Sequence, residues 1–191
     1  MMLEARSPLR NPFGVSMPVN DLTRPDFKVI ERSDFGCVLC SAAVDANEIY
    51  QKLSQKSKLE LPRQSGMVVW QDERAAIWLS LRSWLILCPL DDESELVAMI
   101  NAVFPDHIVL ASTFSDNLCW LSLSGDEAED KLRQGGFISL ADGGLTIGHP
   151  KRTLIAGIPA IIHRKSASVW TIGIERSYAS YFINWLRSVC E

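Results

Sequence analysis

Two cysteines separated by two residues, Cys37 and Cys40, are side chains whose type and spacing could do chemistry. A C-x-x-C pair can be a redox couple or half of a zinc site. The surrounding run FGCVLCSAA, from 35 to 43, is typical of a strand, in which residues three apart point to opposite faces of the sheet. No second C-x-x-C occurs in the chain. We therefore interpret all five cysteines as reduced thiols that lie mostly in the core.

The other candidate motifs lack the spacing that their chemistry needs. The histidines, His107, His149 and His163, are far apart in the sequence, so their spacing predicts no metal site. Glycines between 135 and 148 do not form G-x-G-x-x-G and precede a strand, which excludes the usual dinucleotide loop. Ser124 lacks the G-x-S-x-G context of a hydrolase nucleophile. We expect no catalytic, cofactor-binding or metal site in this chain.

Composition narrows the classes of partner. The chain has 191 residues, a net charge of -4 and a pI of 5.4, without a basic run, which argues against nucleic-acid binding. No apolar run approaches the roughly 20 residues of a membrane span. The first ten residues, MMLEARSPLR, lack the apolar region of a signal peptide. We expect a cytoplasmic protein that binds neither nucleic acid nor a membrane.

The pattern of apolar residues predicts two α+β halves, which would position the cysteine, histidine and serine side chains considered above. The first half, 28–116, has predicted strands at 35–43, 75–79, 84–88 and 107–114, with 67–71 as an extra strand. One helix follows Asp45, and a second begins at Asp91 and ends before Pro105. The apolar positions of the second helix, spaced for one face, are Leu96, Met99, Ile100, Val103 and Phe104.

The second half, 117–191, repeats much of this order. A strand at 119–123 leads into a helix that ends at Gly135, with Ser124 and Glu127 as a predicted capping box. Further strands are predicted at 153–158, 159–164 and 169–175, followed by a last helix with Ser177 as its N-cap. The apolar stripe predicted on that helix is Tyr178, Tyr181, Phe182, Trp185, Leu186 and Val189. The order strand-helix-strand-strand-helix-strand predicts an α+β fold of two ferredoxin-like βαββαβ-type halves and an internal duplication.

The first 27 residues carry several prolines and no periodic pattern, so we predict an extended N-terminal arm over 1–27. Its apolar side chains are Leu9, Phe13, Val15 and Met17. Such an arm lies on its own domain or is partly disordered, or it lies on another subunit. We predict that it lies on another subunit, with these four residues binding a partner.

Four runs carry a resemblance to a known family. They are AIWLSLRSWLILCP (76–89), LSLSGDEAEDKLRQGGFISL (121–140), RTLIAGIPAIIHR (152–164) and IERSYASYFINWLRSV (174–189). In order and spacing they resemble the gamma subunit of heterotetrameric sarcosine oxidase. The most specific features are the Arg-Ser-aromatic-Ala opening of the last helix with its Asn-Trp-Leu, and the Leu-Ser-Gly helix start.

This resemblance implies a fold like the folate-binding domain of the glycine-cleavage aminomethyltransferase. It implies a non-catalytic structural subunit of a complex that oxidatively demethylates sarcosine, with alpha, beta and delta subunits as partners. It also implies that FAD, FMN, NAD, tetrahydrofolate and zinc are held by those partners and not by this chain. The alternative is a stand-alone folate-binding or one-carbon transfer protein of the aminomethyltransferase superfamily. That protein would need an acid placed against the pterin, and the strand at 35–43 offers none.

Overall fold

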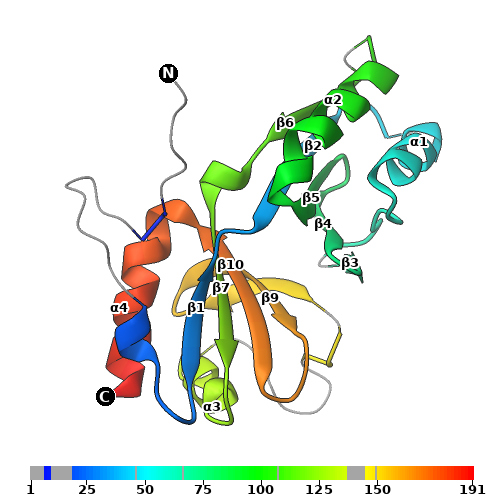
Figure 1. The fold of residues 1–191 in the computed structure, drawn as a ribbon. Helices are drawn as coiled ribbons and strands as arrows, with labels where there is room; N and C mark the ends of the chain where they lie inside the picture. The colour runs from blue at the N-terminus through cyan, green and yellow to red at the C-terminus, as the bar shows by residue number, and fades with distance from the viewer. Residues whose placement is uncertain are drawn as a thin grey trace, which may run out of the picture. The chain divides into compact units, whose positions relative to one another are not determined.

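The computed structural model describes residues 7–9, 19–45, 47–65, 67–106, 108–136, 145–148 and 150–191. They form two compact units. We call Asp34–Ser115 with His149–Lys151 the middle unit, and Met1–Ser33 with Asp116–Gly148 and Arg152–Glu191 the terminal unit. Figure 1 labels most of the helices and strands of both.

The middle unit is a five-stranded sheet with two helices. Its elements in chain order are β2 (Phe35–Ala42), α1 (Asn47–Ser57), β3 (Val68–Gln71), β4 (Arg74–Ser80), β5 (Ser83–Pro89), the 3-10 turn Leu90–Asp92, α2 (Glu93–Val103) and β6 (Val109–Thr113). The strands are ordered β3-β4-β5-β2-β6, and every pair is antiparallel. Leu96 and Ile100 of α2 are buried in its core, as their spacing predicted, whereas Met99 is 36% exposed.

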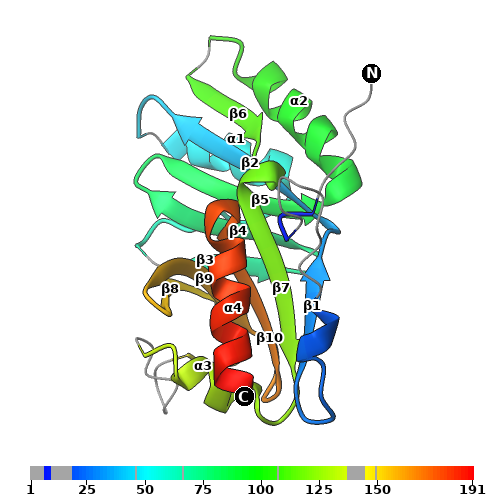
Figure 2. The ribbon, with the colours of Figure 1, turned by 90° about the vertical axis from the view of Figure 1, so that its left-hand side faces the viewer.

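The terminal unit is a second five-stranded sheet, drawn with α4 against it in Figure 2. Its elements are the 3-10 turn Asn20–Leu22, β1 (Lys28–Arg32), the 3-10 turn Ser115–Asn117, β7 (Leu118–Ser124), α3 (Ala128–Arg133), β8 (Lys151–Ile155), β9 (Ile158–Arg164), β10 (Val169–Glu175), the 3-10 turn Arg176–Tyr178 and α4 (Ala179–Cys190). The strand order is β1-β7-β10-β9-β8.

The two sheets have the same strand order once equivalent strands are matched. β2, β3, β4 and β5 correspond to β7, β8, β9 and β10, and the edge strand β6 corresponds to β1. The predicted pair of ferredoxin-like α+β halves is therefore confirmed. In the terminal unit, however, the closing strand comes from the N-terminal part of the chain, which explains why that half ends on a helix.

The structure divides the chain differently from the predicted segments 1–27, 28–116 and 117–191. All five residues of β1 pair antiparallel with β7, from Lys28 opposite Ser124 to Arg32 opposite Trp120. Residues 28–33 therefore join the terminal unit. The cause is non-local, since the partner strand lies about ninety residues further along the chain.

The described part of the predicted arm also belongs to the terminal unit. Leu9, Val19, Leu22 and Phe27 are 2%, 8%, 2% and 1% exposed and lie in its core. The hydroxyl of Ser7 donates to the Glu31 carboxylate on β1, at 2.7 Å from Oε1. The described residues of the predicted arm thus lie on their own unit, which was the first of the two arrangements considered, and not on another subunit.

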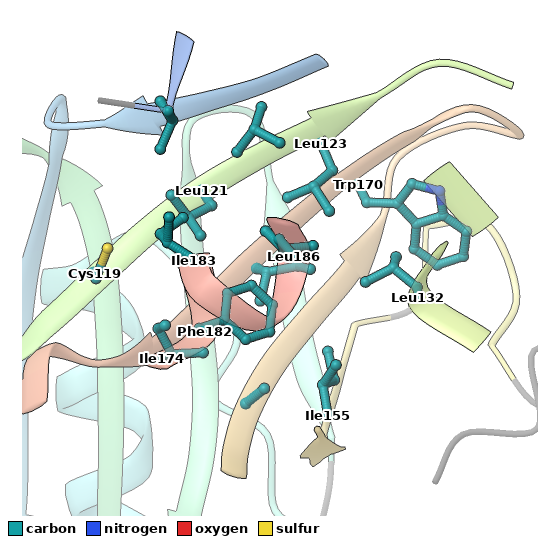
Figure 3. Packing of buried hydrophobic residues seen from close by; sticks show 14 of the residues in the cluster. Cys119, Leu121, Leu123, Leu132, Ile155, Trp170, Ile174, Phe182, Ile183 and Leu186 are labelled. Carbon is teal, nitrogen blue, oxygen red and sulfur yellow. The ribbon is translucent and has the colours of Figure 1, made fainter. Parts of the chain in front are cut away.

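The core of the terminal unit lies between the sheet and the two helices α3 and α4 (Figure 3). Cys119, Leu121 and Leu123 alternate on β7 and are fully buried, as predicted. The buried positions of α4 are Ala179, Phe182, Ile183, Leu186 and Cys190. The helix face is thus rotated from the predicted stripe, and Tyr178 and Tyr181 are 39% and 53% exposed.

Both predicted helix caps of the terminal unit are wrong. Ser124 is the last residue of β7, opposite Lys28 and Val169, so the chain is still extended there. Glu127 is the residue before α3 and makes no side-chain cap bond. Ser177 lies inside the 3-10 turn Arg176–Tyr178, and no side-chain cap bond is made at the start of that turn or of α4.

Candidate functional site

All five cysteines are free thiols and buried, which confirms their interpretation as core residues. Burial raises the pKa of the Cys40 and Cys119 thiols to about 12 and that of Cys88 to about 11. The thiolate is the reactive form of cysteine, so this environment suppresses nucleophilic and redox chemistry. At Cys40 this environment disfavours the thiolate that a redox pair at 37–40 would need.

Of the three histidines, His107 and His149 lie outside the described residues. His163 is on β9, 6% exposed, directly opposite Thr171 of β10. Within the described ranges, no three His, Cys, Asp or Glu side chains lie close enough to hold a metal ion.

A row of polar side chains, which no local sequence pattern indicates, crosses the terminal sheet. Ser122, Thr171 and His163 are directly opposite one another on the neighbouring strands β7, β10 and β9. The Thr171 hydroxyl is buried, and it has no hydrogen-bond partner within the part of the chain that the structure describes. A hydroxyl beside an imidazole resembles a proton-transfer pair. Thr171 is only 1% exposed, however, so the row lacks the solvent access that a substrate needs.

The buried carboxylate in the described part of the middle unit is Glu93, the first residue of α2, which is 8% exposed. Its Oε1 atom accepts from the Ser115 hydroxyl at 2.6 Å and from the backbone N–H groups of Phe114, Ser115 and Cys37 at 3.1, 3.2 and 3.3 Å. The Ser115 hydroxyl also accepts from Cys37 N–H at 2.9 Å. We call this arrangement the Glu93 network. It joins α2 to β2 and to the end of β6, and its role is structural.

A partly buried ion pair lies in the terminal unit, where the side chains of Arg164 and Glu129 are 17% and 22% exposed. Arg164 at the end of β9 donates to Glu129 of α3 at 2.7 Å, and its guanidinium lies 4.8 Å from the ring centroid of Trp170. Glu129 also accepts from Arg133 at 2.7 Å. The arginine is thus neutralised by its own unit, so it is not available to hold an anionic ligand.

Large apolar side chains are exposed at one end of the middle sheet. Val44, Leu81, Ile108 and Leu110 are 52%, 66%, 39% and 55% exposed. Backbone hydrogen bonds bring their segments together: Ala42 N–H donates to Arg82, and Ala43 N–H to Ile108, each at 2.7 Å. We call these four residues the apolar end. Exposed apolar side chains on neighbouring segments are typical of protein-binding surfaces.

The four residues predicted to bind a partner have separate outcomes. Leu9 is 2% exposed within the core of its own unit. Phe13, Val15 and Met17 lie outside the described residues, so their role stays a prediction. None of the described helices has the length and apolar character to span a bilayer.

The fold of two such units is shared with a known class of protein. The structure resembles the glycine cleavage system aminomethyltransferase T from Bartonella henselae, with a TM-score of 0.60 and 15% identity over 95% of this chain. The match covers 50% of that protein, so this chain spans about half its length. The predicted likeness to the aminomethyltransferase fold is therefore confirmed.

A second solved structure covers most of both chains. A heterotetrameric sarcosine oxidase from Corynebacterium sp. U-96, in complex with pyrrole 2-carboxylate, matches with a TM-score of 0.75 and 19% identity, over 86% of this chain and 83% of that one. The model of the sarcosine oxidase gamma subunit family matches residues 41–191. The chain belongs to this family, as the resemblance predicted. No curated protein matches the chain by sequence.

Proposed function

We propose that this chain is the non-catalytic structural subunit of a sarcosine-oxidase-like complex that oxidatively demethylates sarcosine. The match to the gamma subunit family over 41–191 carries the proposal. Two structural observations support it. The thiol of Cys40 is buried, and the carboxylate of Glu93 is buried and hydrogen-bonded within its own unit. The apolar end offers a surface suited to a protein partner.

The partners in this proposal are alpha, beta and delta subunits of the complex, in the cytoplasm. FAD, FMN, NAD, tetrahydrofolate and zinc are bound by those subunits. The flavins supply the oxidation of the substrate, and the residues of this chain take no part in that step. Its contribution is to the assembly.

Isolation of the tagged full chain from its native extract tests the proposal. Large flavin-bearing chains should come with it, whereas the chain expressed alone should be colourless and inactive. A yellow isolated chain, or isolation without flavin-bearing chains, would overturn the proposal. Titration with tetrahydrofolate, followed by tryptophan fluorescence, tests the alternative. Saturable quenching would favour a folate-binding protein, which the aminomethyltransferase-like fold permits.

Two sets of residues are proposed as partner contacts. Serine in place of Leu81 and Leu110 should weaken capture of the large chains, because both side chains are more than half exposed and their loss leaves the core intact. Leu154→Ser on β8, where the side chain is 42% exposed, is the matched control and should leave capture unchanged. An equal loss of capture in the Leu154→Ser control and in the variants of Leu81 and Leu110 would show that the apolar end is not a specific partner contact.

The second set is Phe13, Val15 and Met17. Their segment lies between Leu9 and Val19, both of which are buried in the terminal unit. Deletion of residues 1–25 would therefore remove core side chains as well, and is a poor test. Substitution of the three residues by serine is the sharper one: capture should weaken while the unfolding midpoint of the isolated chain stays unchanged.

A further inference from the structure

β6 is an edge strand, with β2 as its neighbour in the sheet. An edge strand presents backbone N–H and C=O groups to which a strand of another molecule can bind. Which groups of β6 point outward follows from its register with β2.

Alternate residues of an antiparallel pair bond to the neighbouring strand, and those between them point away. At the two ends of the β2–β6 pairing, Ala43 N–H donates to Ile108 and Phe114 N–H donates to Cys37. Both pairs follow the register in which Cys40 is opposite Ala111. The even-numbered residues of β6 therefore bond to β2, and the backbone groups of Val109, Ala111 and Thr113 point to the open edge.

The central outward-pointing residue is bonded by a side chain of α2. Asn101 Oδ1 accepts from Ala111 N–H at 2.8 Å, and Asn101 Nδ2 donates to Ala111 C=O at 2.9 Å. The amide thus supplies one acceptor and one donor in the way that a residue of an adjoining strand would. Figure 2 shows α2 beside β6. Asparagine is a poor helix former, so the two hydrogen bonds, and not helix propensity, account for it within α2.

We propose that Asn101 is an edge cap that closes the middle sheet against a strand from a second copy of this chain. It occupies the backbone groups of Ala111 through which a new strand would start pairing. The inference concerns the fold of the middle unit and does not depend on the function proposed above.

Asn101→Ala in the full chain tests the cap, because alanine removes both hydrogen bonds and favours the helix. At low protein concentration we expect the Ala111 amide to exchange with solvent roughly tenfold faster, since it loses its hydrogen bond. In sedimentation velocity over a concentration series, we expect the association constant to rise roughly tenfold or more above that of the wild type, because each newly paired residue exchanges two hydrogen bonds. The new contact should protect the amides of Val109 and Thr113 from exchange.

Three further variants separate edge exposure from loss of stability. Asn184→Ala removes an asparagine from α4 whose side chain accepts from Arg187 at 3.1 Å, and should not promote association. Ile100→Val weakens the core beside Asn101 and leaves the cap in place. Ser112→Lys, added to Asn101→Ala, puts a charge at an exposed position of the edge and should reverse the association.

The proposal is overturned if Asn101→Ala associates no more than the wild type. It is equally overturned if Ile100→Val associates as strongly, or if association brings no added protection to β6. Those results would mean that Asn101 only holds α2 against β6.

Discussion

Replacement of Glu93 should reveal how much a single buried carboxylate stabilises the middle unit. Four donors converge on its Oε1 atom, but two of them keep another partner when the carboxylate is removed. Phe114 N–H still donates to Cys37 C=O at 2.7 Å, and Cys37 N–H still donates to the Ser115 hydroxyl at 2.9 Å. The backbone N–H and the hydroxyl of Ser115 lose the acceptor they share.

The expected cost of Glu93→Ala is therefore that of about two hydrogen bonds to a charged group, about 3–6 kcal/mol at 1.5–3 kcal/mol for each bond. Glu93→Gln keeps an oxygen acceptor and loses the charge, which should reduce the cost to about 1–3 kcal/mol. The helix-dipole contribution of an acidic residue in the first turn is smaller, about 0.3–1 kcal/mol. Urea unfolding followed by far-UV circular dichroism measures these differences.

Glu95 is the matched control, because it is an exposed glutamate in the same first turn of α2. Glu95→Ala should stay within about 0.5 kcal/mol of the wild type. The double variant Glu93→Ala with Ser115→Ala should cost less than the sum of the single variants, since both remove the 2.6 Å bond. Equal costs for Glu93→Ala and Glu95→Ala, or strict additivity, would refute the reasoning.

Three other predictions follow from burial and backbone geometry. When the pKa of an acid is higher in the folded than in the unfolded protein, its ionisation does not affect stability below the unfolded pKa. Stability then decreases as the pH rises from the unfolded pKa towards the folded pKa. The pKa of Cys40 moves from 9.0 to about 12 on folding. The decrease in the free energy of unfolding between pH 8 and 10 should therefore be about 1.4 kcal/mol smaller in Cys40→Ala than in the wild type. An equal fall in urea titrations would contradict this. Gly125 and Gly157 both have positive φ, but a Cβ at Gly125 would lie 2.1 Å from Asp26 O, whereas one at Gly157 meets nothing within 4 Å. Gly125→Ala should therefore cost more than about 3 kcal/mol and Gly157→Ala about 1 kcal/mol by thermal unfolding, and similar costs would argue against the close approach. Leu9→Ala should cost about 2–4 kcal/mol, because the side chain is buried in the core; a neutral result would contradict the packing of Leu9 in the terminal unit.

Where local pattern was sufficient, the sequence predicted the structure. The alternation on β7 placed Cys119, Leu121 and Leu123 inward, and the spacing on α2 placed Leu96 and Ile100 in the core. Caps were less predictable. Ser124 and Glu127 have the types and spacing of a capping box, but pairing with β1 and β10 keeps Ser124 extended, and Gly125 N–H donates to Ser168 C=O at 3.0 Å. Tertiary hydrogen bonds overrode the local preference.

The sequence by itself determined the element order of each half, the buried thiols and the family, because these depend on residue type and spacing within short segments. Tertiary structure alone decided three other features. β1 completes the terminal sheet, Glu93 accepts hydrogen bonds from β2 and from the end of β6, and Asn101 forms hydrogen bonds with the edge strand β6. Each depends on segments that are distant in sequence and are brought together by strand register, which no local periodicity encodes.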